Sequence, residues 1–407
     1  IYLAKSMSRE NTKMFQINRN LGHTIIAWDE EAVVHYPSQI YYARRIGTEA
    51  LKLIDVIIAW GEDNRELLQA HPNFDTEDIR VLGNPRADLL RQDMSSYFDQ
   101  DTAALTREHG DFILVNTNFG SVNGYADRLN LVRTGGRDTV AGPLGRGASG
   151  MPPGYARGLF DYRRKVMQAF TKLVPKIAHA FPDNSVILRP HPAEDHVFWL
   201  NEFSEVPNVH INAEGNVIPW LLAARCLVHN GCTTAVESSL LGTPIISFVP
   251  IDDSRYEFEL PNKLGERAIS ATAVIEFISA TYEDPLPRCT PPQAQALLSR
   301  FIRPMDETLA AHKIVNLIYD RTRLTRPTKA SSRLLGIARA ELRSLSKSIQ
   351  TFVGVARYSQ GFVRQRFPEI STTKMQDKVD RLTKLISGRQ ALVVSTREPD
   401  LFEINKR

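Results

Sequence analysis

Three adjacent carboxylates follow an apolar segment near the start of the chain. Asp29, Glu30 and Glu31 come directly after residues 23–28, which predict a buried strand. Carboxylates that crowd one another raise the pKa of at least one of the group. A raised pKa suits a general base that accepts a proton from a hydroxyl group, and a carboxylate can also act as a covalent nucleophile. A solvated acidic loop is the alternative interpretation.

A small turn that opens a helix predicts an anion-binding site further along the chain. Residues 226–229 predict a strand, and a helix begins at Thr233 and Thr234 and runs to residue 241. Asn230 and Gly231 lie between them, and glycine allows the backbone to approach a ligand closely. The unbonded N–H groups and the dipole of the helix favour an anion here.

Three side chains further along this helix complete the predicted site. We expect Glu237 to reach a ribose hydroxyl, and Ser238 and Ser239 to donate hydrogen bonds to a phosphate. The alternative is an ordinary capped helix with Thr233 or Thr234 as its N-cap residue.

A histidine between two prolines follows another predicted strand, residues 185–189. The prolines fix the backbone around His191, which can bond a phosphate or protonate a departing nucleotide. Arg189 can present a charged, forked donor to the same ligand, and Pro192 belongs to the same turn. A purely structural histidine is the alternative.

Strands alternate with helices in two series, which predicts an α/β fold with mostly parallel sheets. The first series covers roughly residues 1–90 and the second begins at residue 112, so we expect two Rossmann-like domains, residues 1–100 and 105–326, facing each other across a cleft. Ligands of such sheets bind beyond the carboxyl ends of the strands. Four side chains that follow predicted strands are therefore expected to line the cleft: Asn84, Arg86, Asn116 and Asn118.

Composition narrows the class of protein. At 407 residues, with 43% apolar and 24% charged residues, the chain is an ordinary globular protein of two or more domains. A net charge of +4 is too small for a general nucleic-acid binder. The three cysteines, which include no CxxC pair, argue against a zinc site and a disulfide framework and fit the cytoplasm. We find no apolar stretch of the length a membrane span needs and no signal peptide. Because residues 1–4 already predict a strand, we expect the first domain to be truncated at its start.

Residues 331–407 differ in charge from the rest. They carry 15 Lys and Arg against 7 Asp and Glu, which is a net charge of about +8. Two helical patterns predict a basic helical extension. It is either a pair of surface helices or an arm that contacts anionic lipid or a polyanionic acceptor.

The order of these motifs resembles that of bacterial transferases that use CMP-activated nonulosonic acids, such as sialic acids and Kdo. Those proteins carry an acidic pair before Gly, then His-Pro, then Ser-Ser or Ser-Thr; here they are Glu30-Glu31, His191-Pro192 and Ser238-Ser239. Ala32 stands where Gly is expected. The wider pattern resembles surface-carbohydrate biosynthesis proteins, on Asp29-Glu30-Glu31, Trp60-Gly61, Gly83-Asn84-Pro85-Arg86, Asn116-Thr117-Asn118-Phe119 and Arg189-Pro190-His191-Pro192.

The resemblance covers roughly residues 1–325 and implies a GT-B fold with the nucleotide mainly on the second domain. It implies His191 near the CMP phosphate, Ser238 and Ser239 as phosphate donors, and Glu30 or Glu31 as the catalytic carboxylate. It also implies a glycosyltransferase that needs no metal and no cofactor beyond its nucleotide-sugar donor, and whose acceptor is a surface polysaccharide, such as a capsule, or a glycolipid, such as lipopolysaccharide. The expected partners are therefore that donor and that acceptor, together with peripheral contact with the inner membrane or with other glycan-assembly enzymes, and no nucleic acid.

Three other interpretations remain open. The donor can be CDP-glycerol or a UDP-sugar. The chain can be an epimerase or hydrolase of nucleotide sugars, or a non-catalytic scaffold of a glycan-assembly complex.

Overall fold

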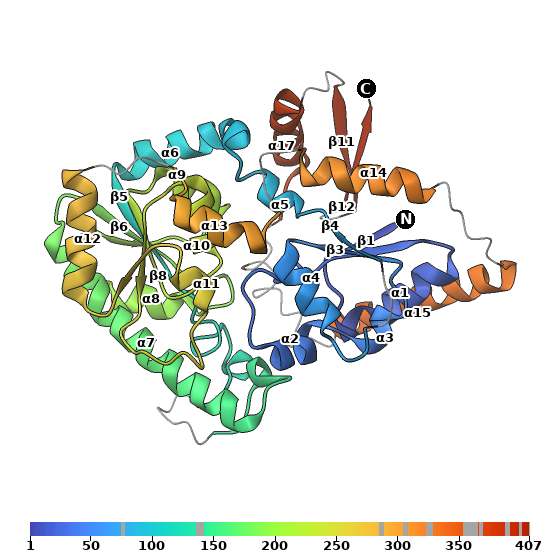
Figure 1. Ribbon diagram of the computed structural model, residues 1–407, viewed down its shortest axis with the longest axis horizontal. Helices are drawn as coiled ribbons and strands as arrows, with labels where there is room; N and C mark the ends of the chain where they lie inside the picture. Colours follow the sequence, from blue (N-terminus) through green and yellow to red (C-terminus); the bar gives the residue numbers. More distant parts are fainter. Residues whose placement is uncertain are drawn as a thin grey trace.

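Two separate parallel sheets organise the chain in the computed structural model, which describes residues 1–74, 78–135, 142–284, 289–303, 308–322, 329–352, 365, 369–386, 391–398 and 401–406. The first sheet has the order β1-β2-β3-β4 and the second β10-β9-β8-β5-β6-β7. The two sheets lie side by side, each with helices packed around it (Figure 1). This is the predicted α/β architecture.

The first sheet is built from short apolar strands. They are β1 (Tyr2–Ala4), β2 (Ile25–Ala27), β3 (Val56–Ala59) and β4 (Asp78–Val81). The chain crosses between them through α1 (Thr12–Asn20), α2 (Ser38–Arg45), α3 (Thr48–Leu51) and α4 (Glu62–Gln69), with a short helix η1 (Arg9–Asn11) before α1. Every residue of β2 and β3 is buried, as expected of parallel strands covered on both faces.

The second sheet contains β5 (Phe112–Asn116), β6 (Ser185–Arg189), β7 (Val209–Ile211), β8 (Cys226–His229), β9 (Ile245–Phe248) and β10 (Glu266–Ala268). Its helices are α6 (Asp99–His109), α7 (Pro153–Ala180), α8 (His196–Glu202), α9 (Val217–Ala223), α10 (Thr234–Leu241), α11 (Glu259–Asn262) and α12 (Ala271–Glu283). Short 3-10 turns are η2 (Gln92–Phe98), η3 (Asp127–Leu129) and η4 (Arg146–Ala148). β8, β5 and β6 lie together at the centre, so their carboxyl ends meet at one edge.

The chain crosses between the domains more than once. After α5 (Pro85–Asp88) it passes to the second domain, and after α13 (Pro292–Phe301) it returns as α14 (Ala310–Thr322). Ile314 of α14 packs against Ile26 and Val56 of the first sheet, and Asp88 accepts hydrogen bonds from the first amides of α14. The predicted second domain, residues 105–326, is therefore too long at its end, because the apolar face of α14 belongs to the first core.

The basic extension contacts both domains. It contains α15 (Ala330–Phe352), which packs on α1, and α17 (Thr372–Leu385), whose Leu382 and Leu385 pack on the second domain. It was predicted as a helical extension with two helices, and its last residues add an antiparallel pair that was not predicted, β11 (Leu392–Glu398) and β12 (Leu401–Lys406) (Figure 1). No helix in the described part of the chain is both long and apolar enough to cross a membrane.

Candidate functional site

The loop after β2 carries the acidic triplet onto the second domain. Ala32 and Val33 are buried in one cluster with Ala235 and Val236 at the start of α10. Tyr36 stacks on Phe258 of the second domain, with ring centroids 5.2 Å apart. Ala32, which stands in place of an expected Gly, thus serves as an apolar contact between the domains.

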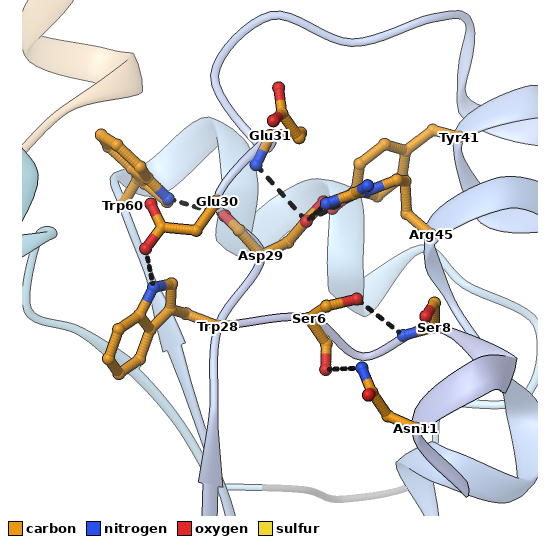
Figure 2. A network of polar contacts seen from close by, with 10 residues as sticks. All are labelled: Ser6, Ser8, Asn11, Trp28, Asp29, Glu30, Glu31, Tyr41, Arg45 and Trp60. Carbon is orange, nitrogen blue, oxygen red and sulfur yellow. Dashed lines mark hydrogen bonds and ion pairs between the residues drawn. The ribbon is translucent and has the colours of Figure 1, made fainter. Parts of the chain in front are cut away.

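The three carboxylates of the triplet point to different neighbours rather than crowding one another (Figure 2). Asp29 is buried, ion-paired with Arg45, and accepts a hydrogen bond from the Tyr41 hydroxyl at 2.9 Å. Glu30 accepts from the indole of Trp28 at 3.0 Å and pairs with Lys5 at 3.2 Å. The expectation of crowding is wrong, because each side chain leaves the loop in its own direction. Asp29 and Glu30 hold the loop in place.

Glu31 differs from the other two carboxylates. Its side chain is exposed, and it lies close enough to Arg86 and Glu237 to influence the pKa of both. It is therefore the carboxylate of the triplet that a substrate between the domains can reach.

An ion pair between the domains faces Glu31. Arg86, in α5, contacts one carboxylate oxygen of Glu237, in α10. Burial raises the pKa of Glu237, and its carboxylate raises the pKa of Arg86. The second oxygen of Glu237, Oε2, is buried without a hydrogen-bond partner among the described residues. Asn84 is buried and caps α5, because its Oδ1 accepts from the amide of Arg86 at 2.9 Å; of the predicted pair, Arg86 contacts the other domain.

A buried histidine shapes the turn that precedes α10. His229 is fully buried, and its Nδ1 accepts from the amide of Gly231 at 2.9 Å. Its Nε2 therefore carries the proton and donates to Ser247 Oγ at 2.8 Å. Burial lowers the pKa of His229 to about 3, so the ring is neutral. Gly231 has φ 77°, which favours glycine.

The turn that opens α10 contains two backbone amides that no described group bonds. The amides of residues 235–237 turn back to the carbonyls of Cys232 and Thr233, and the amide of Thr234 bonds the thiol of Cys232. Within the described ranges, no acceptor bonds the amides of Cys232 or Thr233, and Thr233 makes no side-chain cap. That an anion binds at Thr233 and Thr234 stays a prediction.

Ser238 and Ser239 do not join it. Both are buried in the interior of the second domain, and Ser238 Oγ donates to the carbonyl of Thr243 beyond the end of α10. Ser239 Oγ is buried and lacks a partner in the described part of the chain. The prediction that these hydroxyls bind phosphate is wrong, because they face the interior rather than the turn at residues 230–234.

His191 lies exposed in the turn after β6. Its Nδ1 accepts from the amide of Ala193 at 3.1 Å, so the Nε2 side of the neutral ring carries a proton that it can donate. Pro192, also exposed, offers its carbonyl to Gln365 of the extension at 2.9 Å.

Glu194, which no sequence motif singles out, anchors this turn. Its carboxylate is fully buried and accepts from the amides of His191 and Phe119, from Thr117 Oγ1 and from the indole of Trp199, all within 3.0 Å. It thereby ties the turn after β6 to the turn after β5. Burial raises its pKa, while these four donors act in the opposite direction.

Arg189 is not part of the ligand site. Its guanidinium is buried over the ring of Trp220 and donates to the carbonyls of Asn212, Glu214 and Gly215. Burial lowers its pKa to about 10. The prediction of a charged fork for phosphate is therefore corrected, since its donors are already used to hold residues 212–215.

Polar atoms without partners gather at the carboxyl ends of β5 and β8. Asn116 Oδ1 and Asn230 Oδ1 are both buried, and neither has a hydrogen-bond partner among the residues that the structure describes. Asn118, two residues after β5, is half-buried. Unpaired buried polar atoms are costly, so their concentration at this edge indicates a site that a polar ligand completes. In the described ranges, no group of His, Cys, Asp or Glu is arranged to hold a metal ion.

Two parallel-sheet domains thus contact each other around the carboxyl ends of their strands. This is the GT-B arrangement. The chain matches no protein-family model, and no curated protein matches it. Among solved structures, it is similar to the wall teichoic acid polymerase TagF, with 13% identity over 75% of this chain and 70% of that chain and a TM-score of 0.48. It is also similar to the UDP-GlcNAc 2-epimerase from Methanocaldococcus jannaschii, with 11% identity over 78% of this chain and 76% of that chain and a TM-score of 0.47.

Proposed function

We propose that this protein is a glycosyltransferase that moves a sugar from a nucleotide-activated donor onto a surface polysaccharide or glycolipid. One observation carries the proposal. Exposed Glu31 of the first domain lies near Glu237 of the second, and the residues that follow it, Ala32 and Val33, pack on the start of α10, which the unbonded amides of Cys232 and Thr233 precede. A carboxylate on one side and anion-binding amides on the other are what sugar transfer from a phosphate requires.

Each group then has a role. The amides of Cys232 and Thr233 and the Nε2–H of His191 donate to the phosphate as it departs and gains negative charge. Glu237 Oε2 accepts from a ribose hydroxyl. Glu31 accepts the proton of the attacking hydroxyl. These donors neutralise the leaving nucleotide themselves, and we propose a reaction that needs no metal or further cofactor.

The finer proposal is a CMP-linked acidic sugar as donor. It rests on the order of Glu30-Glu31 and His191-Pro192 in the sequence. If a nucleotide screen selects another nucleotide, the alternative donors are CDP-glycerol and a UDP-sugar.

A thermal-shift screen against CMP, CDP, UDP and GDP tests nucleotide binding. A nucleotide at 100 times its Kd adds about 2.7 kcal/mol of stability, which raises Tm. We expect CMP or CDP to give the largest shift. If none of the four nucleotides shifts Tm, the chain does not bind a nucleotide donor and a scaffold role takes its place.

Glu31→Gln tests the catalytic carboxylate. The amide cannot accept a proton, so we expect turnover to fall by about 10²- to 10⁴-fold while nucleotide affinity stays unchanged. Glu49→Gln, an exposed carboxylate on α3, is the control and should keep full activity. Turnover equal to wild type in Glu31→Gln would remove Glu31 from the mechanism, and nucleotide release independent of an acceptor would indicate a hydrolase or epimerase instead.

We also propose that the extension rests on the anionic cytoplasmic face of the inner membrane. One stripe of α15 exposes Leu335, Leu342, Leu345 and Ile349, at helical spacing, while Gly336 of the same helix packs against α1. Arg339 and Arg343 flank the stripe. An apolar stripe beside basic residues is typical of a helix that lies in a membrane interface, where a glycolipid acceptor is found.

A further inference from the structure

A small cavity lies beside the turn that precedes α10. It is enclosed by α7, by the ends of β8 and β9 and by residues 256–262, and its polar lining includes Arg163, Asn230, Glu257 and Asn262. The ideal Cβ position at Gly231 is 3.5 Å from Asn262 Oδ1. The cavity therefore opens next to the amides assigned to the donor phosphate.

Arg163 is a buried cation without an acidic partner. Its side chain is 8% exposed and packs against two aromatic rings, 5.4 Å from Phe258 and 5.9 Å from Tyr36. One N–H group donates to Ser121 Oγ at 2.8 Å. Across the described ranges, no carboxylate pairs with it and no second acceptor bonds its guanidinium, whose remaining nitrogens keep some contact with solvent. An unpaired buried charge is costly, so the arrangement favours an anion that is brought in by a ligand.

Arg189, the other arginine described above as buried, differs from Arg163 in the hydrogen bonds of its guanidinium. Both arginines are buried to the same extent, and both stack on aromatic rings. The guanidinium of Arg189 is satisfied by three backbone carbonyls, as its structural role requires. That of Arg163 is bonded by a single neutral hydroxyl and faces a cavity. Packing alone accounts for Arg189 but not for Arg163.

Two acceptors lie in the same cavity. Asn230 Oδ1 and Asn262 Oδ1 are buried and have no donor in the described part of the chain. The amide nitrogen of Asn262 donates to Glu257 at 3.1 Å, which turns its oxygen away from that carboxylate. Glu257 is itself paired with Arg267. Arg44 stacks on Tyr36 at 5.5 Å and adds a second positive charge near Arg163.

We propose that this cavity binds an anionic, hydroxylated group of the transferred unit or of the acceptor. A carboxylate or phosphate pairs with Arg163, and neighbouring hydroxyl groups donate to Asn230 and Asn262. The inference rests on the proposed function and extends it, because it assigns the acidic specificity to residues outside the nucleotide site.

Calorimetric titration of the full chain tests the cavity with small probes, in the presence of saturating CMP or whichever nucleotide the thermal-shift screen selects. The probes are N-acetylneuraminate for a carboxylate, glycerol 3-phosphate for a phosphate, and glycerol as the neutral reference. We expect one acidic probe to bind at least about tenfold more tightly than glycerol, as a charge-assisted hydrogen bond predicts. A preference for the carboxylate assigns the cavity to an acidic donor sugar, and a preference for the phosphate assigns it to a glycerol phosphate unit.

Arg163→Gln is the decisive variant. We expect its affinity for the preferred acidic probe to fall by about 10- to 100-fold, while its affinity for the nucleotide alone stays within about threefold of wild type. Arg164→Gln is the matched control, because Arg164 is the next residue of α7 and already pairs with Asp161. It should bind both ligands as wild type does.

A second variant guards against a folding defect in Arg163→Gln. Asn262→Ala leaves the charge in place, and we expect a smaller, about threefold to tenfold, loss for the same probe. Equal binding of acidic and neutral probes to wild type would overturn the proposal. An equal loss of nucleotide and probe affinity in Arg163→Gln would also overturn it, since Arg163 would then belong to the nucleotide site. Neither result depends on whether the chain catalyses transfer, which the nucleotide screen and the Glu31 variant decide.

Discussion

Buried polar side chains at the ends of the strands determine the shape of this site without facing its ligand. His229 fixes the turn before α10 through the amide of Gly231, and Glu194 joins the turns after β5 and β6. Asp29 does the same for the loop after β2. Glu31 and His191, which we propose to face the ligand, follow segments that these side chains hold in place.

His229 gives the stability of the fold a defined dependence on pH. Its imidazole has a pKa of about 3 in the folded chain, against 6.5 as its ordinary value. Below pH 6.5 the unfolded chain binds a proton that the folded chain does not accept, so stability that is fully present above pH 6.5 is lost as the pH falls towards 3. The loss reaches about 1.4 kcal/mol per pH unit at most.

His229→Asn isolates this contribution, because the side-chain oxygen can still accept from the Gly231 amide but does not titrate. We expect the variant to be less stable at pH 7 by about 1 kcal/mol, through the lost bond to Ser247, and to lose stability less steeply between pH 6.5 and 4. Urea unfolding across that range measures the difference. His210→Asn, at an exposed position of β7, is the control, and equal slopes in His229→Asn and wild type would contradict the assignment.

The sequence predicted which residues lie near the ends of the strands better than it predicted where their side chains point. Glu31, His191, Gly231 and Thr233 were singled out because they follow strands; the last three lie at the carboxyl ends of the second sheet, and Glu31 follows β2 of the first. Arg189 at the end of β6 and the helical residues Ser238 and Ser239 were predicted as phosphate donors, yet their side chains face the interior. Direction depends on long-range partners, such as the carbonyls of residues 212–215, which no local pattern reveals. The burial of Glu194 beside Trp199 also depends on distant partners, the hydroxyl of Thr117 and the amide of Phe119.

At the scale of elements, two helices from different domains meet at a glycine. The start of α4 and the end of α13 approach so closely that a Cβ atom at Gly61 would lie 2.5 Å from the carbonyl oxygen of Arg300. The amide of Arg303 donates to the carbonyl of Trp60 at 2.8 Å, which fixes the two segments against each other. Gly61 is therefore required for space, since its backbone is extended and open to any residue.

Gly61→Ala should push α13 away from α4. Overpacking of this kind costs about 1–3 kcal/mol, so we expect a lower free energy of unfolding and a lower Tm. Gly154→Ala, in the first turn of α7, is the control, because nothing lies within 4 Å of its Cβ position. That variant should unfold at the wild-type temperature or slightly above it. A Tm for Gly61→Ala equal to that of the control would show that the two helices can separate freely.

The helix boundaries agree with the local sequence pattern only where no residue distant in the sequence contacts the segment. The apolar spacing of residues 155–180 predicts one long helix, and α7 covers them. Residues 38–53 also have a helical pattern, but the structure divides them into α2 and α3 at Gly47. The amide of Gly47 donates to the carbonyl of Met7, and its Cβ position lies 2.6 Å from the amide of Arg9. The helix is therefore interrupted by a contact with residues about 40 positions earlier, which the apolar periodicity of residues 38–53 does not reveal.

At the scale of the whole molecule, the proposed membrane contact of α15 predicts which lipid surfaces the chain binds. If α15 lies on anionic lipid, the chain should sediment with vesicles containing phosphatidylglycerol and not with neutral phosphatidylcholine vesicles. Binding should weaken as salt rises, because the basic flank of the helix contributes about 1 kcal/mol per Lys or Arg.

Replacing Leu342 and Leu345 together by Gln should abolish this sedimentation, since both are exposed on the apolar stripe. Ile404→Gln, an equally exposed apolar residue on β12, should sediment as wild type does. Unchanged binding of the double variant would place the membrane contact elsewhere or reduce it to charge alone.

The return of α14 to the first sheet has a consequence for how such a protein can change over generations. Ile26 and Val56, near the start of the chain, are covered by Ile314 of a helix that follows the entire second domain. A gene fusion that joined the first hundred codons to a new partner would inherit the strands without the helix that shields them. The first domain is therefore built from two separated segments of the chain, and its N-terminal segment alone is not an exchangeable module.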